Sequence, residues 1–421
     1  MMLVEVILWG ELVGVIAWNE NTQTTSFEFA PKFIQSGLEL SPILLPVSNK
    51  VMEITNSTVV SDISIVSADG LPLLIADSLP DKFGTDLFLK YLEKEGKNYR
   101  DLSPLEKLTY IGNRGMGALE YRPSKAGKES QQTLNLNTLS QLSESLMNDQ
   151  PIANRADLAN LIHVGTSPGG AQPKVLLNMN RNTGDLYRGD QLPIENQESW
   201  ILKFNKDIGV DSDKERGKIE YAYYLIARKC GITIMDSELL SYENEHYFMT
   251  KRFDRLNGEK MHTQTVHALA GMNFRLPNTY SYEQLFTVLN RMNVDYPAKE
   301  QLFRIMVFNI IGRNVDDHTK NFGFSMDKSG KWQFSPAYDL TFTYNENYKR
   351  PTPHFLSVNG ININHQLEDV LSLAEKFTIK QPKSLISMIQ NCFLDWENTA
   401  NTLDISQNTL NYIASKHLTL L

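Results

Sequence analysis

Short runs in which apolar and polar residues alternate occupy the first sixty residues of the chain. A period of two is typical of half-buried β-strands. The pattern predicts strands at residues 3–9, 11–18, 25–29 and 43–47, with turns at Gly10 and around residues 19–21. Because Pro46 cannot donate a backbone hydrogen bond, we expect the last of these strands to lie at a sheet edge.

The spacing changes to that of helices near residue 85. Apolar positions from Leu87 to Leu92 recur at helical intervals, which predicts a helix over residues 85–96. A second helix is expected over residues 103–111, with Ser103 as its N-cap. These elements predict a small β-rich domain over residues 1–123. A polar tract at 128–133 and a helix at 136–146 predict that residues 124–155 are a linker with a helix.

From residue 162 onward, strands alternate with one helix, and from about residue 281 the chain becomes mainly helical. A strand-rich part followed by a helix-rich part suggests two lobes with a cleft between them, where ligands usually bind. We therefore expect one lobe at residues 156–255 and the other at residues 256–421. The predicted fold class is α+β.

Composition narrows the class of protein. With 421 residues, 41% hydrophobic and 21% charged, the chain is typical of a soluble globular protein of two or three domains. A net charge of −8 gives it no electrostatic reason to bind DNA unaided. Its two cysteines show no metal-ligand spacing, which fits a reducing cytoplasm, and we expect Cys230 to be a small core residue. No signal peptide or membrane span is readable, so we expect a cytoplasmic protein.

A glycine-rich stretch at residues 165–174 precedes the apolar run 175–177. Small residues let backbone amides approach phosphate oxygens closely, and consecutive amides can bind an anion. The stretch is not a Walker A sequence, because no Gly-Lys-Ser/Thr ends it, and Pro168 removes one donor. A glycine-rich turn between strands is the structural alternative.

Two charged residues on predicted regular elements follow the glycine stretch. Lys203 lies late on an apolar strand, as does the kinase lysine that contacts ATP phosphates. Glu220 lies on a helix predicted over residues 214–230 and could pair with Lys203, as the corresponding helix glutamate does in kinases. An edge lysine and an exposed helix glutamate are the alternatives.

The loop at residues 312–322 follows the apolar segment 302–311. In it, Asp316 and Asn321 are five positions apart, the interval of the kinase catalytic loop, whose aspartate orients the attacking hydroxyl and whose asparagine binds Mg²⁺. Turn residues at 327–330 then predict a β-hairpin. Such a hairpin would bring Asn321 and Asp339 to the same open end, as hard oxygen ligands for Mg²⁺ beside Asp316. A solvated polar turn is the alternative.

These features occur in the order in which protein kinases have them. The order is glycine loop, strand lysine, helix glutamate, a joining strand at residues 247–253, catalytic loop and metal aspartate. Each feature alone is weak, but six in sequence predict phosphoryl transfer. The expected fold is two-lobed and protein-kinase-like, with a small N-terminal β-rich subdomain and a mainly helical C-terminal lobe.

Longer motifs resemble those of the HipA family of bacterial serine/threonine kinases, the toxins of type II toxin–antitoxin pairs of the HipBA type. The resemblance spans nearly the whole chain, and its most specific parts are Gly-Gly-Ala-Gln-Pro-Lys at 169–174 and Asp-x-His-x-Lys-Asn at 316–321. The other matching segments are residues 8–15, 79–84, 112–119, 167–168, 252–255 and 338–340.

The resemblance implies a set of site residues. Asp316 would be the catalytic base, and Asn321 and Asp339 would be the Mg²⁺ ligands. Ser167 would be autophosphorylated, with Thr166 as the alternative acceptor, and the added charge would repel nucleotide phosphates. The residues implied at ATP are Gly169, Gly170, Ala171, Gln172, Lys174, Lys203, Lys251, Phe253, His318, Asn321 and Asp339.

Three positions of this set carry a further remark. His318 is expected to be a structural hydrogen-bonding residue and neither an acid nor a base. Asp317 stands where the family often has a small residue, and Lys251 stands where an acidic residue can occur.

The resemblance also implies partners. A HipB-like helix-turn-helix antitoxin would bind the chain, and the pair would repress its own operon on operator DNA. The protein substrate would be a cellular protein such as an aminoacyl-tRNA synthetase, whose phosphorylation causes growth arrest or persistence. Two other functions stay open: a kinase-like phosphotransferase for a small molecule, and a non-catalytic corepressor that only holds the antitoxin.

Overall fold

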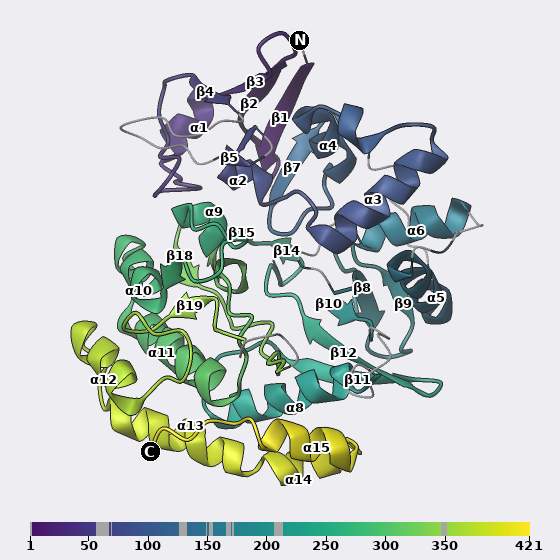
Figure 1. The fold of residues 1–421 in the computed structure, drawn as a ribbon. Helices are drawn as coiled ribbons and strands as arrows, with labels where there is room; N and C mark the ends of the chain where they lie inside the picture. Colours follow the sequence, from purple (N-terminus) through teal and green to yellow (C-terminus); the bar gives the residue numbers. More distant parts are fainter. Residues whose placement is uncertain are drawn as a thin grey trace. The chain divides into compact units, whose positions relative to one another are not determined.

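The computed structural model describes residues 2–55, 67–68, 70–125, 133–148, 150, 155–165, 170, 172–205, 214–346 and 352–421. Helices and strands both contribute substantially, which confirms the α+β class (Figure 1). The chain divides into two compact units. Unit 1 consists of Met1–Lys206, Met249–Gln264 and Ser325–Lys331, and unit 2 of Asp207–Phe248, Thr265–Phe324 and Trp332–Leu421.

Unit 1 begins with an antiparallel sheet of strand order β4-β3-β2-β1-β7 (Figure 1). Its strands are β1 (Met2–Leu8), β2 (Glu11–Asn19), β3 (Thr24–Phe29), β4 (Met52–Thr55) and β7 (Leu119–Arg122). The first three predicted strands are confirmed. The fourth is wrong, because residues 43–47 form turns and irregular backbone. Pro46 has no backbone N–H to donate, so it is more compatible with irregular backbone than with a strand.

Helices of unit 1 cover this sheet and a second one. They are α1 (Pro31–Ser36), α2 (Leu73–Ala76), α3 (Lys82–Lys94), the 3₁₀ turn η1 (Tyr99–Asp101), α4 (Pro104–Ile111), α5 (Leu136–Met147) and α6 (Arg155–Gly165). The predicted N-cap is confirmed, since Ser103 and Glu106 form a complete capping box at α4. The α6 helix was not predicted from the sequence, where its apolar residues had been assigned to a strand-rich part.

The second sheet of unit 1 carries the glycine stretch at one end. It contains β8 (Lys174–Asn180), β9 (Leu186–Arg188), β10 (Gln197–Lys203) and the second half of β12 (Glu245–Lys251), in the order β12-β10-β8-β9. Short strands complete the unit: β5 (Ser67–Ala68), β6 (Leu71–Pro72), β13 (Arg255–Leu256), β14 (Glu259–Lys260) and most of β15 (His262–Thr265).

Unit 2 is mainly helical, as the sequence predicted for residues after 281. Its helices are α8 (Arg216–Lys229), α9 (Val266–Ala270), α10 (Tyr282–Arg291), α11 (Tyr296–Ile311), the 3₁₀ turn η2 (Thr319–Asn321), α12 (Leu367–Lys376), α13 (Pro382–Leu394), α14 (Trp396–Thr402) and α15 (Gln407–Ala414). Its strands are β11 (Ser237–Tyr242), β16 (Tyr280–Ser281), β18 (Trp332–Phe334) and β19 (Leu356–Ser357). The strand β17 (Gly323–Met326) pairs with β18, which confirms the predicted hairpin.

Helix α13 packs against α8 and α11 in unit 2 (Figure 1). An aromatic cluster joins these three helices. Tyr223 of α8 lies edge-on to Phe308, Phe393 and Trp396, and all four side chains are buried. Its hydroxyl donates a hydrogen bond to the carbonyl oxygen of Gly312 at 2.6 Å. The cluster therefore fixes the end of α11, where the predicted catalytic loop begins.

A buried ion cluster holds unit 1 together around Asp254. The Asp254 carboxylate accepts hydrogen bonds from Arg252 Nε and Nη2, from Arg255 Nη1 and from the backbone N–H of Gly117, at 2.7–2.9 Å. Arg255 also donates to the carbonyl oxygens of Gly117 and Gly115. The motif at 252–255 thus binds the backbone of the motif at 112–119, two segments that are far apart in the sequence.

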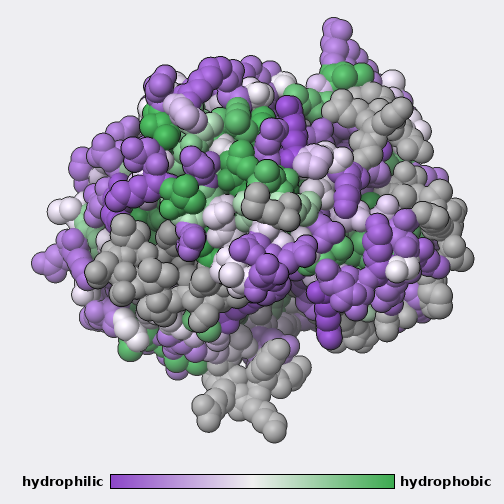
Figure 2. Space-filling model, turned by 90° about the horizontal axis from the view of Figure 1, so that it is seen from above, coloured by the Kyte–Doolittle hydropathy of each residue, from purple (hydrophilic) through white to green (hydrophobic). Residues whose placement is uncertain are grey.

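Hydrophilic and hydrophobic side chains are mixed on one face of the molecule. On the face seen in Figure 2, hydrophobic side chains (green) occur in small groups between hydrophilic ones (purple). Within the described ranges, no helix combines the length and the hydropathy needed to span a bilayer.

We expect Asp254→Asn to destabilise unit 1 by about 3–5 kcal/mol, because two arginines would remain buried without their counter-charge. Burial alone raises the pKa of Asp254, but the charges of Arg252 and Arg255 outweigh it and hold this pKa below its ordinary value. A lowered pKa in the folded state adds stability above the unfolded-state pKa of about 4, and this stability is lost as the pH falls further. The gap between wild type and variant should therefore narrow below about pH 4, as measured by urea unfolding.

The control for this experiment is Glu259→Gln. Glu259 pairs with Lys328 at 2.7 Å, but both side chains are more than half exposed. An exposed pair contributes about 0–1 kcal/mol, so this variant should unfold almost like wild type. Equal losses in the two variants would contradict the role assigned to the buried cluster.

Candidate active site

The loop that follows α11 is tightly built at its start. Helix α11 is almost entirely buried from Gln301 to Ile311 and ends at Gly312. A β-carbon on Gly312 would lie 2.4 Å from the ring of Phe393, so no larger residue fits there. Arg313 follows with φ +58°, in the left-handed region, and its guanidinium lies over the ring of Tyr344. The loop therefore leaves the helix in a fixed direction.

The two neighbouring aspartates of the loop have opposite surroundings. Asp316 is exposed, whereas Asp317 is fully buried. The Asp317 carboxylate accepts hydrogen bonds from the Tyr282 hydroxyl at 2.8 Å, from His354 Nδ1 at 2.9 Å and from the backbone N–H of Phe355 at 2.8 Å. Burial and the charge of Asp317 raise the pKa of Tyr282, which keeps the proton that it donates. Asp317 thus anchors the loop, and the preceding residue, Asp316, is exposed to solvent.

A second set of polar contacts joins the loop to the segment that carries Asp339. Asn314 Nδ2 donates to the carbonyl oxygen of Asp339 at 3.1 Å. The Thr343 hydroxyl contacts Asn314 Oδ1 and accepts from the backbone N–H groups of Val315 and Asp316, at 2.7–3.2 Å. Asp316 and Asp339 therefore lie on two segments that are held in register by Asn314 and Thr343.

Asn321 and Asp339 lie at the same end of the β17–β18 hairpin. The Tyr338 hydroxyl donates to the carbonyl oxygen of Lys320 at 2.9 Å, which joins the residue before Asp339 to the residue before Asn321. Asn321 Nδ2 donates to the carbonyl oxygen of Asp316 at 2.7 Å. This bond occupies the amide nitrogen and leaves the amide oxygen of Asn321 as the atom available to a cation. Asp339 has φ +54°, an uncommon backbone conformation for a residue other than glycine.

This arrangement fits a magnesium ion that takes few ligands from the protein. Among the described residues, no group of three or more His, Cys, Asp and Glu side chains could enclose a metal ion. Mg²⁺ commonly takes one or two protein oxygens, and water and phosphate complete its octahedron. One carboxylate and one amide oxygen, as in Asp339 and Asn321, satisfy that requirement.

A second group of predicted residues lies at one end of the β8–β10 sheet in unit 1. Lys174 and Lys203 are directly opposite each other in the antiparallel pair, and both are buried. Directly opposite residues share a face, so both lysine side chains leave the same face of the sheet. Their predicted contact with the phosphates of ATP stays a prediction. Gln172 Nε2 donates to the carbonyl oxygen of Phe204 at 3.1 Å, which fastens the end of the glycine stretch to β10.

The start of α3 fastens Gly170. Its backbone N–H donates to Asp81 Oδ2 at 2.9 Å, and its carbonyl oxygen accepts from the N–H of Phe83. Gly170 has φ +99°, a backbone conformation that strains residues with a side chain and so favours glycine. The segment 79–84 thus supports the glycine stretch, a role that its sequence did not indicate. Gly169, Ala171, Ser167 and Thr166 lie outside the described residues.

Other predicted residues have side chains with visible structural roles. Lys251 Nζ pairs with Glu198 Oε1 at 2.9 Å and lies over the ring of Trp200, so only its backbone could serve a nucleotide. Phe253 lies in the turn between the two buried arginines of the Asp254 cluster. His318 packs edge-on against Phe274 and Phe355, but its Nδ1 is buried without a hydrogen-bond partner among the described residues, so the hydrogen bond expected of this side chain is not seen at that atom.

Glu220 is buried in α8, not exposed. It belongs to unit 2 and Lys203 belongs to unit 1, so their pairing stays a prediction. The anchors Asp317, Asn314 and Thr343 were missed by sequence reasoning. A polar residue in a polar loop carries no signal that its side chain is buried, and Thr343 stands 29 residues after Asn314.

We expect Asp317→Asn to loosen the loop without touching the exposed aspartate. An amide cannot accept from all the donors that surround this position, and an unmet buried donor costs about 1–3 kcal/mol. Amide hydrogen exchange should accelerate in residues 312–321 and 354–357. The control, Asp316→Asn, changes an exposed side chain and should leave exchange in residues 354–357 at the wild-type rate. Unchanged exchange in Asp317→Asn would contradict the anchoring role.

Comparison with known proteins places the chain in a family. A family model of the HipA-like C-terminal domain matches residues 166–403, and a model of the HipA N-terminal domain matches residues 4–122. The serine/threonine-protein kinase toxin HipA of Shewanella oneidensis MR-1 is 23% identical over an alignment of 142 residues, and the match covers 29% of this chain and 33% of that protein. The aligned stretch therefore spans about a third of the length of this relative.

A solved structure resembles nearly the whole chain. It is a chain of the Shewanella oneidensis MR-1 complex of HipA, HipB and operator DNA, with a TM-score of 0.67 and 16% identity, covering 98% of this chain and 94% of that one. This likeness confirms the predicted kinase-like fold. Because the two family models together match most of the described sequence, the chain belongs to the HipA family.

Proposed function

We propose that the chain is an ATP- and Mg²⁺-dependent protein serine/threonine kinase that acts as the toxin of a type II toxin–antitoxin pair. The observation that supports the proposal is the exposed carboxylate of Asp316, in a loop that is hydrogen-bonded to the side chain of Asn321 and, through Asn314, to the backbone of Asp339. Membership in the HipA family and the name of the related toxin support the same reaction.

The residues divide the work of phosphoryl transfer between them. Asp316 orients an acceptor hydroxyl and takes its proton, because it is the exposed aspartate of the loop. The carboxylate of Asp339 and the amide oxygen of Asn321 would hold the metal ion. When bound, ATP would supply the phosphoryl group and Mg²⁺ would neutralise the charge that develops on it. Lys174 and Lys203 bind phosphate oxygens through their ammonium groups.

The binding partners that we propose are those of a solved relative. The solved relative lies in a complex with HipB and operator DNA, so we propose a HipB-like antitoxin and operator DNA as partners of this chain. With a net charge of −8, the chain gains little from direct phosphate contacts, and the antitoxin supplies most of them. The protein substrate, with an aminoacyl-tRNA synthetase as the family example, and autophosphorylation at Ser167 belong to the same proposal.

We expect Asp316→Ala to lower the rate of phosphoryl transfer from labelled ATP by about 100-fold or more, the usual contribution of a general base. ATP binding should persist, since the metal and phosphate ligands remain. Growth inhibition on expression should disappear together with the activity. The control is Asp236→Asn, an exposed aspartate of the same unit, which should behave like wild type.

The other outcomes separate the alternative functions. Persistent growth inhibition by an inactive Asp316→Ala protein would favour the non-catalytic corepressor. Loss of activity without any change in the phosphoproteome of expressing cells would favour a small-molecule phosphotransferase. An Asp316→Ala protein that transfers phosphate at the wild-type rate would overturn the assignment of the base.

We expect Asp339→Asn to raise the Mg²⁺ concentration needed for half-maximal ATP binding by about tenfold or more, because one full charge leaves the ligand set. The measurement is a titration of the protein with a fluorescent ATP analogue, repeated at several Mg²⁺ concentrations. Asp316→Asn should keep the wild-type Mg²⁺ dependence, which distinguishes a metal ligand from a base. The same shift in both variants would refute this division of roles.

A further inference from the structure

The two cysteines of the chain lie side by side in unit 2. Cys230 ends helix α8, and Cys392 lies near the end of helix α13. Their thiols are within hydrogen-bonding reach of each other. The sequence separates them widely, so only the packing of α8 against α13 brings them together.

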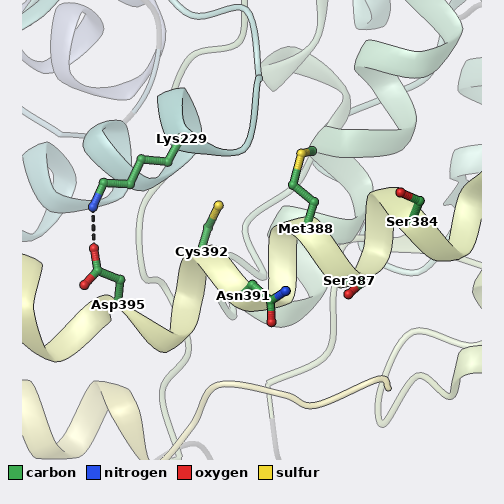
Figure 3. Close-up of a pocket in the computed structure, with 7 residues that line it drawn as sticks. All are labelled: Lys229, Ser384, Ser387, Met388, Asn391, Cys392 and Asp395. Carbon is green, nitrogen blue, oxygen red and sulfur yellow. Dashed lines mark hydrogen bonds and ion pairs between the residues drawn. The ribbon is translucent and has the colours of Figure 1, made fainter.

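Only one of the two thiols is accessible. Cys230 is fully buried, whereas Cys392 is partly exposed and lines a surface pocket together with Lys229, Met388 and Asn391. Figure 3 shows the Cys392 side chain pointing from α13 toward α8, beside the ion pair of Lys229 and Asp395. A small solute in this pocket therefore meets Cys392, whereas Cys230 does not line the pocket.

We propose that Cys392 is a site of oxidation by hydrogen peroxide or a similar two-electron oxidant, and that Cys230 resolves the product into a disulfide between α8 and α13. In the first step the Cys392 sulfur attacks one peroxide oxygen, which gives the sulfenic acid and releases water. In the second step the Cys230 sulfur displaces that hydroxyl as a second water. Overall, two thiols lose two electrons and two protons to one peroxide molecule.

The surroundings predict that the second step is slow. Burial, more than any other cause, raises the pKa of the Cys230 thiol, so little thiolate is present at neutral pH. Thiolate is the attacking species in this exchange. The sulfenic acid should therefore persist long enough to be trapped before the disulfide closes. Closing also requires the sulfur atoms to approach to about 2.05 Å, which moves α8 and α13 slightly together.

The disulfide would lie among the residues of α8 and α13 that hold the start of the predicted catalytic loop. Tyr223 of α8 donates to the Gly312 carbonyl oxygen, and Phe393, the residue after Cys392, packs on the α-carbon of Gly312. Gly312 and Arg313 set the direction of the loop that carries Asp316. Oxidation should therefore change the rate of phosphoryl transfer. This consequence rests on the proposed kinase function, whereas the formation of the disulfide is independent of that function.

The test uses the full-length reduced protein treated with hydrogen peroxide, quenched with N-ethylmaleimide and digested without reductant. We expect a linked peptide pair containing Cys230 and Cys392, which disappears on treatment with dithiothreitol. In Cys230→Ser, a sulfenic acid reagent such as dimedone should label Cys392 and no linked pair should form. In Cys392→Ser, the buried Cys230 should stay unmodified.

Other results would overturn the proposal. Among them are a Cys230 that reacts as fast in Cys392→Ser as in wild type, and a Cys392 that proceeds only to the sulfinic acid. A bond between the Cys392 residues of two molecules would do the same. Phosphoryl transfer is measured before and after oxidation, with Cys392→Ser as the insensitive control. If the linked pair forms but no protein transfers phosphate, the proposed function fails and the thiol chemistry stands.

Discussion

The buried carboxylate of Asp317 is the interaction on which the candidate site depends. An ionised carboxylate removed from water is costly unless donors surround it. Here the donors come from Tyr282 at the start of α10 and from the segment that contains His354 and Phe355. Because these donors are fixed in the packed unit, the loop has one favourable position. The preceding side chain, that of Asp316, consequently stays at the surface.

The other contacts of the loop restrict it from further directions. Gly312 is held between Tyr223 and Phe393, so the aromatic cluster of α8, α11 and α13 determines where the loop begins. Asn314 and Thr343 then determine how far the loop lies from the segment of Asp339. The charged groups of the predicted site are thus held by neutral hydrogen bonds and by packing as well. Such preorganisation reduces the cost of orienting groups during a reaction.

Unit 1 uses a buried aspartate in a comparable way. Asp254 has two arginines and a backbone N–H as donors, and it ties the segment 252–255 to Gly117. Both segments belong to motifs by which the chain resembles its family, yet their side chains form a structural joint. The same holds for Asp81, which fastens Gly170 at the glycine stretch. A residue of a family motif can therefore hold another segment of the chain in position without contacting a ligand itself.

Much of the fold could be predicted from local pattern. Period-two alternation located β1, β2 and β3, and helical spacing located α3, α4 and α5, because these patterns reflect burial on one face of a single element. The run at 43–47 misled, since a short apolar stretch with a proline packs equally well as irregular backbone. The α6 helix was not predicted, because the expected start of the strand-rich part at residue 162 lies inside this helix.

The sequence by itself determined the order of the motifs, the five-residue interval from Asp316 to Asn321 and the β17–β18 hairpin, which has Asn321 and Asp339 at its open end. These are short-range properties, since chain connectivity and turn chemistry restrict residues that are close in sequence. Only the tertiary structure decided that Asp317 is buried and Asp316 exposed, that Thr343 joins the loop to its neighbour, and that Cys230 lies beside Cys392. Burial and partnership between distant segments depend on the packing of whole helices, which no local pattern of residues records.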